Sequence, residues 1–279
     1  MNKDFIRRAM SEVLTDLSRP ALVQAAKANL YAFYRQLEYS PAIKFDRRDG
    51  FCRWHSRVPY PWFNGVLSSR PATTADGTYV DETVDYFKSF GPDMITWWLE
   101  PDLKRGDWES VLAPRGFRFS ADTPGMAADL AKLNEDLQGP SGLDITQVES
   151  EESLRLWSEI FVSGYGLPPG WSPLMFEFMA GLGLDMPVRN FLGNLDGRPV
   201  AASTLFCGAG VAGIYCVSTL PEARGKGIGA AVTLKPLQEA REMGYRAGVL
   251  QSSEMGYSVY KKLGFEHICQ IEHFYCHLD

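Results

Sequence analysis

One glycine-rich segment constrains the fold of this chain more than any other. It reads R-x-x-G-x-G and consists of Arg224, Gly225, Lys226, Gly227, Ile228 and Gly229. The segment before it, 211–220, is uncharged and rich in β-branched and aromatic residues, which favours a buried strand. The segment after it, 228–243, has apolar residues at helical spacing. The sequence therefore predicts a turn that opens a helix, where bare backbone N–H groups suit a phosphate.

On its own, such a loop is also compatible with a tight turn that binds nothing. Two other phosphate motifs are excluded. The chain contains no G-x-x-x-x-G-K-[ST], which argues against a nucleoside triphosphate loop. The glycines do not follow the order G-x-G-x-x-G, and the loop lies late in the chain rather than after a first strand.

A second motif follows the first, in the segment Ser258 to Phe265, and has the form [LV]-Y-x-x-L-G-F. The two motifs in this order resemble the GNAT superfamily of acyl-CoA-dependent N-acyltransferases, and the match runs from Tyr215 to Phe265. Strand patterns over 247–252 and 267–277, with a helix pattern over 254–263, also follow the family's order. The resemblance implies an α+β GNAT fold, in which helices flank a mixed central β-sheet.

The resemblance also implies roles for individual residues. In the family, the backbone of the first motif, here Arg224 to Gly229, holds the pyrophosphate of coenzyme A. The preceding strand parts from its neighbour at a bulge, and the pantetheine arm pairs with the freed edge, which is here Val217, Ser218 and Thr219. The tyrosine of the second motif, Tyr260, is the usual general acid for the departing thiolate. Without the resemblance, Tyr260 is equally a core aromatic of an amphipathic helix.

The chain departs from the family pattern at two places. Many members have an asparagine about seven residues before the tyrosine, where this chain has Ser253. This shorter side chain either bonds the cofactor arm, the role assigned to it here, or leaves that contact to water. Histone-type members have a glutamate on the strand before the loop, and the segment 213–215 contains none. Glu177 and Asp185 are then the acidic candidates for a general base, although each is also typical of an ordinary surface charge.

In the family, the acceptor side is lined by the loop and helix that follow the first strand. We expect that strand over 144–148, a helix over 151–164, and a second helix from Ser172. A hairpin is predicted over 188–195 and 199–207, since Asp196-Gly197 is a strong two-residue turn signal. The position implies four acceptor-site candidates, which also suit simple packing of a helix on the sheet: Tyr165, Trp171, Phe176 and Phe178.

The first half of the chain echoes the second. The segment 111–117, VLAPRGF, resembles 259–265, VYKKLGF, which lies 148 residues later. Strand patterns at 65–69 and 94–99 and a helix pattern at 81–90 repeat the family's order. We therefore expect two tandem GNAT-like domains, residues 1–139 and 143–279, separated by the breaker cluster 138–142.

The first domain is expected to begin with helices over 2–38 and to be degenerate. Leu112 stands where Tyr260 stands in the second copy. The segment 70–77, which takes the place of the glycine-rich loop, lacks the motif, and Pro71 removes one N–H.

The sequence predicts an N-acetyltransferase that transfers an acetyl group from acetyl-CoA to a primary amine by direct attack in a ternary complex. The alternatives are a non-catalytic acyl-CoA-binding module and an interaction module whose loop is a relic. The net charge of −6 disfavours nucleic acid as a partner. The five cysteines and the charged N-terminus predict a cytoplasmic protein without a signal peptide. No metal site is expected, because Cys269, His273, Cys276 and His277 lack the spacing of a zinc site. No membrane span is expected either, because the uncharged stretch 200–217 contains several glycines and suits two strands.

Overall fold

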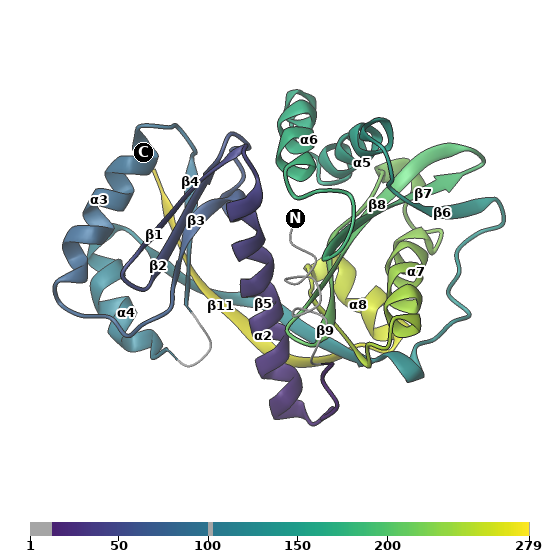
Figure 1. Cartoon of the computed structure of the whole chain (residues 1–279), viewed down its shortest axis with the longest axis horizontal. Coiled ribbons are helices and arrows are strands. Elements are labelled where there is room, and N and C mark those ends of the chain that lie inside the picture. The colour runs from purple at the N-terminus through teal and green to yellow at the C-terminus, as the bar shows by residue number, and fades with distance from the viewer. Residues whose placement is uncertain (1–12, 100–102, 279) are drawn as a thin grey trace.

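The computed structural model describes residues 13–99 and 103–278. The described strands form one eleven-stranded mixed sheet with the order β1-β2-β3-β4-β11-β5-β10-β9-β8-β7-β6. Helices α3 and α4 lie at the end of the molecule that holds β1–β4, and α5–α8 surround the strands of the other end, with α2 between the two (Figure 1). None of the described helices is long and apolar enough to cross a membrane.

The elements of the two halves have these bounds. The first half contains α2 (Arg19–Gln36), β1 (Ile43–Arg48), β2 (Phe51–Ser56), β3 (Asn64–Ser68), α3 (Asp76–Lys88), β4 (Met94–Leu99), α4 (Arg105–Leu112) and β5 (Arg118–Asp129). The second half contains β6 (Leu143–Gln147), α5 (Glu151–Gly164), α6 (Ser172–Ala180), β7 (Val188–Leu195), β8 (Arg198–Gly208), β9 (Val211–Thr219), α7 (Ile228–Glu242), β10 (Ala247–Gln251), α8 (Glu254–Leu263) and β11 (Glu266–His277).

The elements expected in the second half are confirmed with small shifts at their ends. The start of α5 shows one local detail, a capping box built from two serines. Ser150 and Ser153 form it, because each hydroxyl accepts a hydrogen bond from the other residue's backbone N–H at 3.1 Å. A serine hydroxyl therefore takes the place of the usual glutamate.

The first half differs more from expectation. Helix α3 begins at Asp76 rather than at Asp81, and residues 13–17 are not helical, since α2 begins at Arg19 with a proline in its first turn. The expected helical start over 2–12 lies outside the described residues. The β1–β2 hairpin was not predicted, although its turn Asp49-Gly50 repeats the Asp196-Gly197 signal. Both turns place both residues at positive φ.

The two halves exchange their last strands. β5 and β11 are both twelve residues long and begin 148 residues apart, directly after the two echoing segments. β5 lies between β10 and β11, whereas β11 lies between β4 and β5. All of these contacts are antiparallel, as in the pairs Val249↔Ala127 and Phe274↔Trp97. Each half therefore completes the sheet of the other, and the boundary at 138–142 divides the chain but not the sheet.

Helix α2 of the first half packs on the sheet of the second. The Asn29 carboxamide donates to the Gly208 carbonyl at 2.8 Å and accepts from the Tyr215 hydroxyl at 2.6 Å. Phe33 stacks on the Tyr215 ring with centroids 4.3 Å apart. Because these contacts are buried, α2 fixes β9 from one face, while α7 and α8 pack in a separate core with residues of β8–β10.

The strand exchange predicts that neither half folds alone. A fragment of residues 143–279 lacks β5, so β10 and β11 lose the strand that pairs with both of them. We expect this fragment to show no cooperative thermal unfolding by circular dichroism. Co-expression of 1–139 with 143–279 is expected to restore a folded complex. Cooperative unfolding of the isolated fragment near the melting temperature of the full chain would contradict this.

Candidate active site

Strands β9 and β10 part in the middle of the sheet. Their parallel pairing covers only 212–214 of β9 against 248–250 of β10, although β9 continues to Thr219. The pairing of β9 with β8 shifts register between Ala202 and Thr204, and at this bulge Cys216 has φ +53°, a left-handed conformation that is uncommon for a residue other than glycine. The expected bulge and splay are confirmed, and Val217, Ser218 and Thr219 have one edge free of β10.

The glycine-rich loop lies at the end of this splayed strand. Gly225 and Gly227 have φ of +76° and +80°, which explains why glycine is required at both. Gly227 is the N-cap of α7, and no side chain caps this helix. Within the described residues, no hydrogen bond uses the N–H groups of Gly225, Gly227 or Gly229. These donors and the positive end of the α7 dipole suit an anion.

Arg224 holds the loop in place. Its guanidinium donates to the Thr219 carbonyl at 3.1 Å and to the Gly164 carbonyl at 2.7 Å, so it joins the ends of β9 and α5. Lys226 is exposed and donates to the Glu222 carbonyl at 3.3 Å. Ser253 is exposed at the start of α8, where its hydroxyl accepts from the Gly256 N–H at 3.2 Å and caps the helix.

Tyr260 lies on the same face of the sheet as α7. Its side chain is 8% exposed, and burial raises the pKa of Tyr260 to about 12, while a hydrogen bond with Thr233 acts in the opposite direction. The Thr233 hydroxyl in turn donates to the Gly229 carbonyl at 2.9 Å. The phenol is therefore protonated at neutral pH and is linked through α7 to the glycine-rich loop.

A cluster of weakly acidic groups surrounds the bulge. Burial raises the pKa of Tyr165 well above its usual value, and Cys216, Tyr260 and Tyr60 raise it further. Tyr165 nevertheless keeps 44% of its surface exposed, which places it at a rim rather than in the core. Burial also raises the pKa of the Cys216 thiol to about 12. Tyr60 belongs to the first half, and its aromatic segment 60–63 was the sequence signal that could have revealed it.

The other predicted acceptor residues pack more deeply. Trp171 is half-buried in the short helix before α6, and Phe176 lies 3.8 Å from the Arg155 guanidinium. Phe178 is fully buried, with its ring centroid 4.7 Å from that of Phe63 in the first half. The structure thus brings Tyr165 to the bulge with Tyr260, whereas Phe178 joins the two halves.

The two candidate bases are engaged in other contacts. Glu177 accepts from Arg57 of the first half at 3.1 Å. Asp185 accepts from the Met186 N–H at 2.7 Å and lies 3.4 Å from the Arg189 guanidinium. Because both carboxylates are exposed and paired, neither is placed to take a proton at the bulge.

In the first half, the segment 70–77 takes the place of the glycine-rich loop, and it contains a carboxylate, Asp76. Asp76 begins α3 and accepts from the Thr73 N–H at 2.6 Å, while the Arg70 guanidinium binds both of its oxygens at 2.5 and 2.9 Å. Burial alone would raise the pKa of Asp76, but these hydrogen bonds outweigh it and hold the pKa below its usual value. A carboxylate paired with an arginine therefore lies at this helix start, where the second half has glycines.

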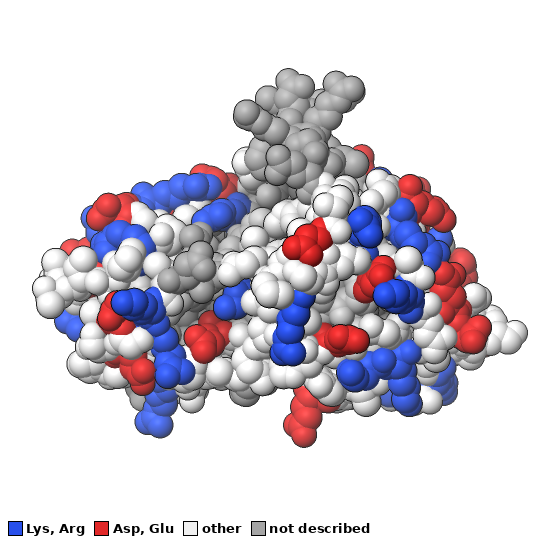
Figure 2. Space-filling model, turned by 90° about the horizontal axis from the view of Figure 1, so that it is seen from below, with Lys and Arg blue, Asp and Glu red and all other residues white. Residues whose placement is uncertain are grey.

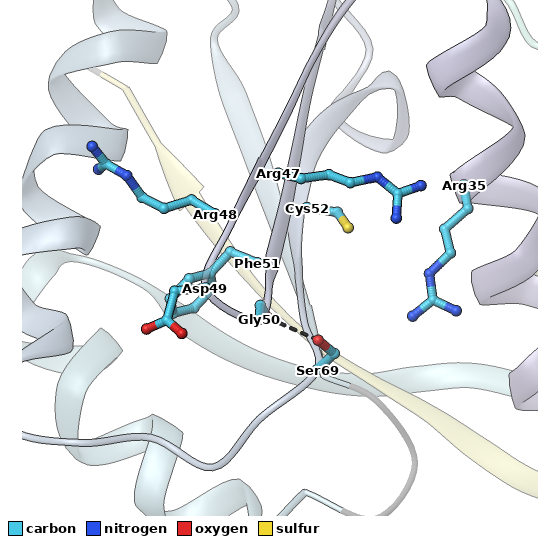
Figure 3. Close-up of a pocket in the computed structure, with 8 residues that line it drawn as sticks. All are labelled: Arg35, Arg47, Arg48, Asp49, Gly50, Phe51, Cys52 and Ser69. Carbon is cyan, nitrogen blue, oxygen red and sulfur yellow. Dashed lines mark hydrogen bonds between the residues drawn. The ribbon is translucent and has the colours of Figure 1, made fainter.

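A hollow of about 380 Å³ lies at the turn between β1 and β2. Figure 3 shows Arg35, Arg47 and Cys52 on one side of the hairpin and Arg48 on the other. Arg47 forms an ion pair with Glu38, and Arg48 donates to Glu82 at 2.8 Å. The hollow contains none of the predicted site residues.

Residues 209–268 match the family model described as an acetyltransferase (GNAT) domain. This segment contains the splayed strand, the glycine-rich loop and Tyr260. The chain carries a GNAT domain. A comparison with curated proteins found no match.

Solved structures show the same fold over nearly the whole chain. A GCN5-related N-acetyltransferase from Kribbella flavida is 20% identical, with a TM-score of 0.63 over 90% of this chain and 95% of that one. A tandem GNAT protein from the clavulanic acid biosynthesis pathway is 14% identical, with a TM-score of 0.55 over 96% and 98%. A GCN5-related N-acetyltransferase from Sphaerobacter thermophilus is 14% identical, with a TM-score of 0.59 over 96% and 95%. At these identities the likeness establishes the GNAT fold alone.

The Asp76 carboxylate predicts a pH-dependent contribution to stability. Because the pKa of Asp76 is lower in the folded chain than in the unfolded one, its contribution is present above the unfolded pKa, about 3.9, and is lost as pH falls through the folded value. We expect Asp76→Asn to lower the free energy of unfolding by about 2–4 kcal/mol at pH 7. Urea unfolding at pH 7 and pH 3 measures this. A deficit of the same size at both pH values would contradict the assignment.

Proposed function

We propose that this protein transfers an acetyl group from acetyl-CoA to a primary amine by direct attack in a ternary complex. The observation that carries the proposal is the splay of β9 from β10 beside an uncapped glycine-rich helix start. In this proposal the N–H groups of 225–229 bind the pyrophosphate, the freed edge of 217–219 pairs with the pantetheine arm, and Ser253 lies at the rim.

The reaction needs three contributions from the chain. Backbone N–H groups of the freed β9 edge polarise the thioester carbonyl as the amine nitrogen attacks its carbon. The C–N bond forms, the tetrahedral intermediate collapses, and the C–S bond breaks. Tyr260 donates its proton to the departing thiolate, which a phenol that is protonated at neutral pH can do. The amine loses its own proton to solvent.

The proposal places the amine at the bulge in its neutral form. Glu177 and Asp185 are both held in ion pairs, so neither is free to act as a general base. The groups that raise the pKa of Tyr165 at the bulge are two phenols and a thiol, which are not carboxylates. A neutral amine attacks without a general base, so amines of low pKa are favoured. This supports an acceptor other than a strongly basic lysine side chain.

Charge and cysteine chemistry support the remaining assignments. On the face shown in Figure 2, basic and acidic side chains are interspersed rather than gathered into one basic patch, which does not favour nucleic acid as a partner. All five cysteines are free, which supports a reducing compartment such as the cytoplasm.

A matched pair of substitutions tests the phosphate site. Gly225 has φ +76° and open space around the position of a Cβ, and asparagine and aspartate both tolerate this conformation better than other residues. The two variants differ only in charge. We expect Gly225→Asp to weaken acetyl-CoA binding at least about tenfold in calorimetry, which corresponds to about 1.4 kcal/mol. Gly225→Asn is expected to stay within about threefold of the wild type. Equal affinities for the two variants would argue against the assignment.

A second pair of variants tests the general acid. Tyr260→Phe removes the phenol and is expected to lower kcat by about a hundredfold or more, while the affinity for acetyl-CoA is nearly unchanged. Tyr257→Phe, on the same helix, is the control and is expected to leave kcat within about twofold. If Tyr260→Phe keeps full turnover, Tyr260 is not the acid.

The pKa of Tyr260 predicts the shape of the pH profile. With a pKa of about 12, the phenol stays protonated through pH 10. The value of kcat/KM is therefore expected to rise with pH until the amine substrate is deprotonated, and then to stay level up to pH 10. Initial rates between pH 6 and pH 10 measure this, and a falling limb centred below pH 9 would exclude Tyr260 as the donor.

A further inference from the structure

Two buried hydrogen-bond donors of the first half have no partner in the described structure. Tyr34 of α2 and Trp98 of β4 are 3% and 1% exposed, and both the Tyr34 hydroxyl and the Trp98 Nε1–H lack a hydrogen bond among the residues described. Their rings lie side by side, with centroids 5.3 Å apart. Folded proteins rarely leave such groups unsatisfied, so two unpaired donors on neighbouring rings point to a ligand or a water that accepts from them.

The Tyr34 hydroxyl belongs to the surroundings of the bulge. Burial raises its pKa well above the usual value, and Tyr215, Tyr31, Cys216 and Tyr60 raise it further. Cys216 is the bulge residue itself, and it also raises the pKa of Tyr60 and of Tyr165. Since α2 packs in the same core as α5 and α6, Tyr34 lies on the face opposite α7 and α8. Tyr34 therefore packs in the core that covers β9 on the side away from α7.

The side chains around the two donors are aromatic. Tyr34 stacks on Trp54 with centroids 4.9 Å apart, and Trp98 meets the half-buried Trp62 edge-on at 5.8 Å and the His273 ring at 4.8 Å. Tyr34, Trp54, Trp62 and Trp98 are uncharged side chains. A phenol and an indole are neutral donors, so they suit a neutral carbonyl oxygen better than a buried carboxylate, which needs a cation beside it.

We propose that the acceptor is an aromatic primary amine that also carries a neutral carbonyl oxygen, and that Tyr34 Oη and Trp98 Nε1 donate hydrogen bonds to this oxygen. The inference rests on the proposed acetyl transfer and deepens it. The first half then selects the substrate while the second half holds acetyl-CoA. A carbonyl next to the amine also lowers the pKa of that amine, to about 8 in peptide N-termini, which suits a site without a general base.

Three amines separate the features of this acceptor. Phenylalaninamide has the ring and the neutral carbonyl, phenethylamine lacks the carbonyl, and phenylalanine replaces it with a carboxylate. We expect the wild type to use phenylalaninamide with a kcat/KM at least about tenfold above the other two at pH 9, when each value is calculated on the concentration of the neutral amine. Equal use of phenylalaninamide and phenethylamine would overturn the proposal.

A matched pair of variants assigns the carbonyl contact. Tyr34→Phe is expected to lower kcat/KM for phenylalaninamide about tenfold, chiefly through KM, and to leave phenethylamine within about twofold. Tyr79→Phe removes another buried phenol, in the core around α3 and α4, and is expected to change neither substrate. If Tyr34→Phe lowers kcat/KM equally for both amines, the role of Tyr34 is purely structural. If it lowers kcat/KM for neither, a buried water is the hydrogen-bond partner of the Tyr34 hydroxyl. Both results overturn the proposal.

Binding measurements keep this inference separate from the proposed function. Calorimetry of acetyl-CoA with the wild type and with Tyr34→Phe is expected to give the same affinity, because Tyr34 lies on the acceptor side. Titration of phenylalaninamide into protein saturated with coenzyme A is expected to show binding that Tyr34→Phe weakens about tenfold. If the wild type does not bind acetyl-CoA, the proposed function is wrong. If it binds acetyl-CoA but not phenylalaninamide, only the inference about the acceptor is wrong.

Discussion

The pairing of β5 with β11 is the interaction on which the rest of the molecule depends. It joins two strands that begin 148 residues apart in an antiparallel ladder with two register shifts, near the middle of the sheet. On one side the ladder borders β4, and on the other it borders β10, from which β9 parts to create the candidate site. The position of β10 is thus set by a strand of the first half.

The two halves use one scaffold with opposite electrostatics at the same place. In the second half, α7 begins with glycines and unpaired N–H groups, and in the first half α3 begins with the Asp76 carboxylate held by Arg70. At the first helix start a carboxylate is paired with an arginine, whereas at the second the described structure leaves the N–H groups of Gly225, Gly227 and Gly229 without an acceptor. The two halves therefore differ in their chemistry at equivalent places of one fold.

The sequence predicted the second half well because its signals are local. The glycines of the loop, the Asp196-Gly197 turn and the amphipathic α8 each specify a structure within a few residues. The exchange of β5 and β11 could not be predicted in this way, since a strand's pattern fixes which of its faces is buried but not which strand lies beside it. Tyr34 and Tyr60 were missed for the same reason, because they approach the bulge through tertiary packing and carry no motif. Trp98 was missed as well, since only the fold brings its ring beside that of Tyr34.

The strand exchange also has a consequence for synthesis of the chain. A ribosome synthesises β4 and β5 well before β11, so one edge of each strand stays unpaired until β11 has emerged. The N-terminal half therefore cannot complete its fold before the second half is made, as separate domains on one chain usually do. While residues 130–265 are being synthesised, these open edges expose the nascent chain to aggregation or to chaperone binding.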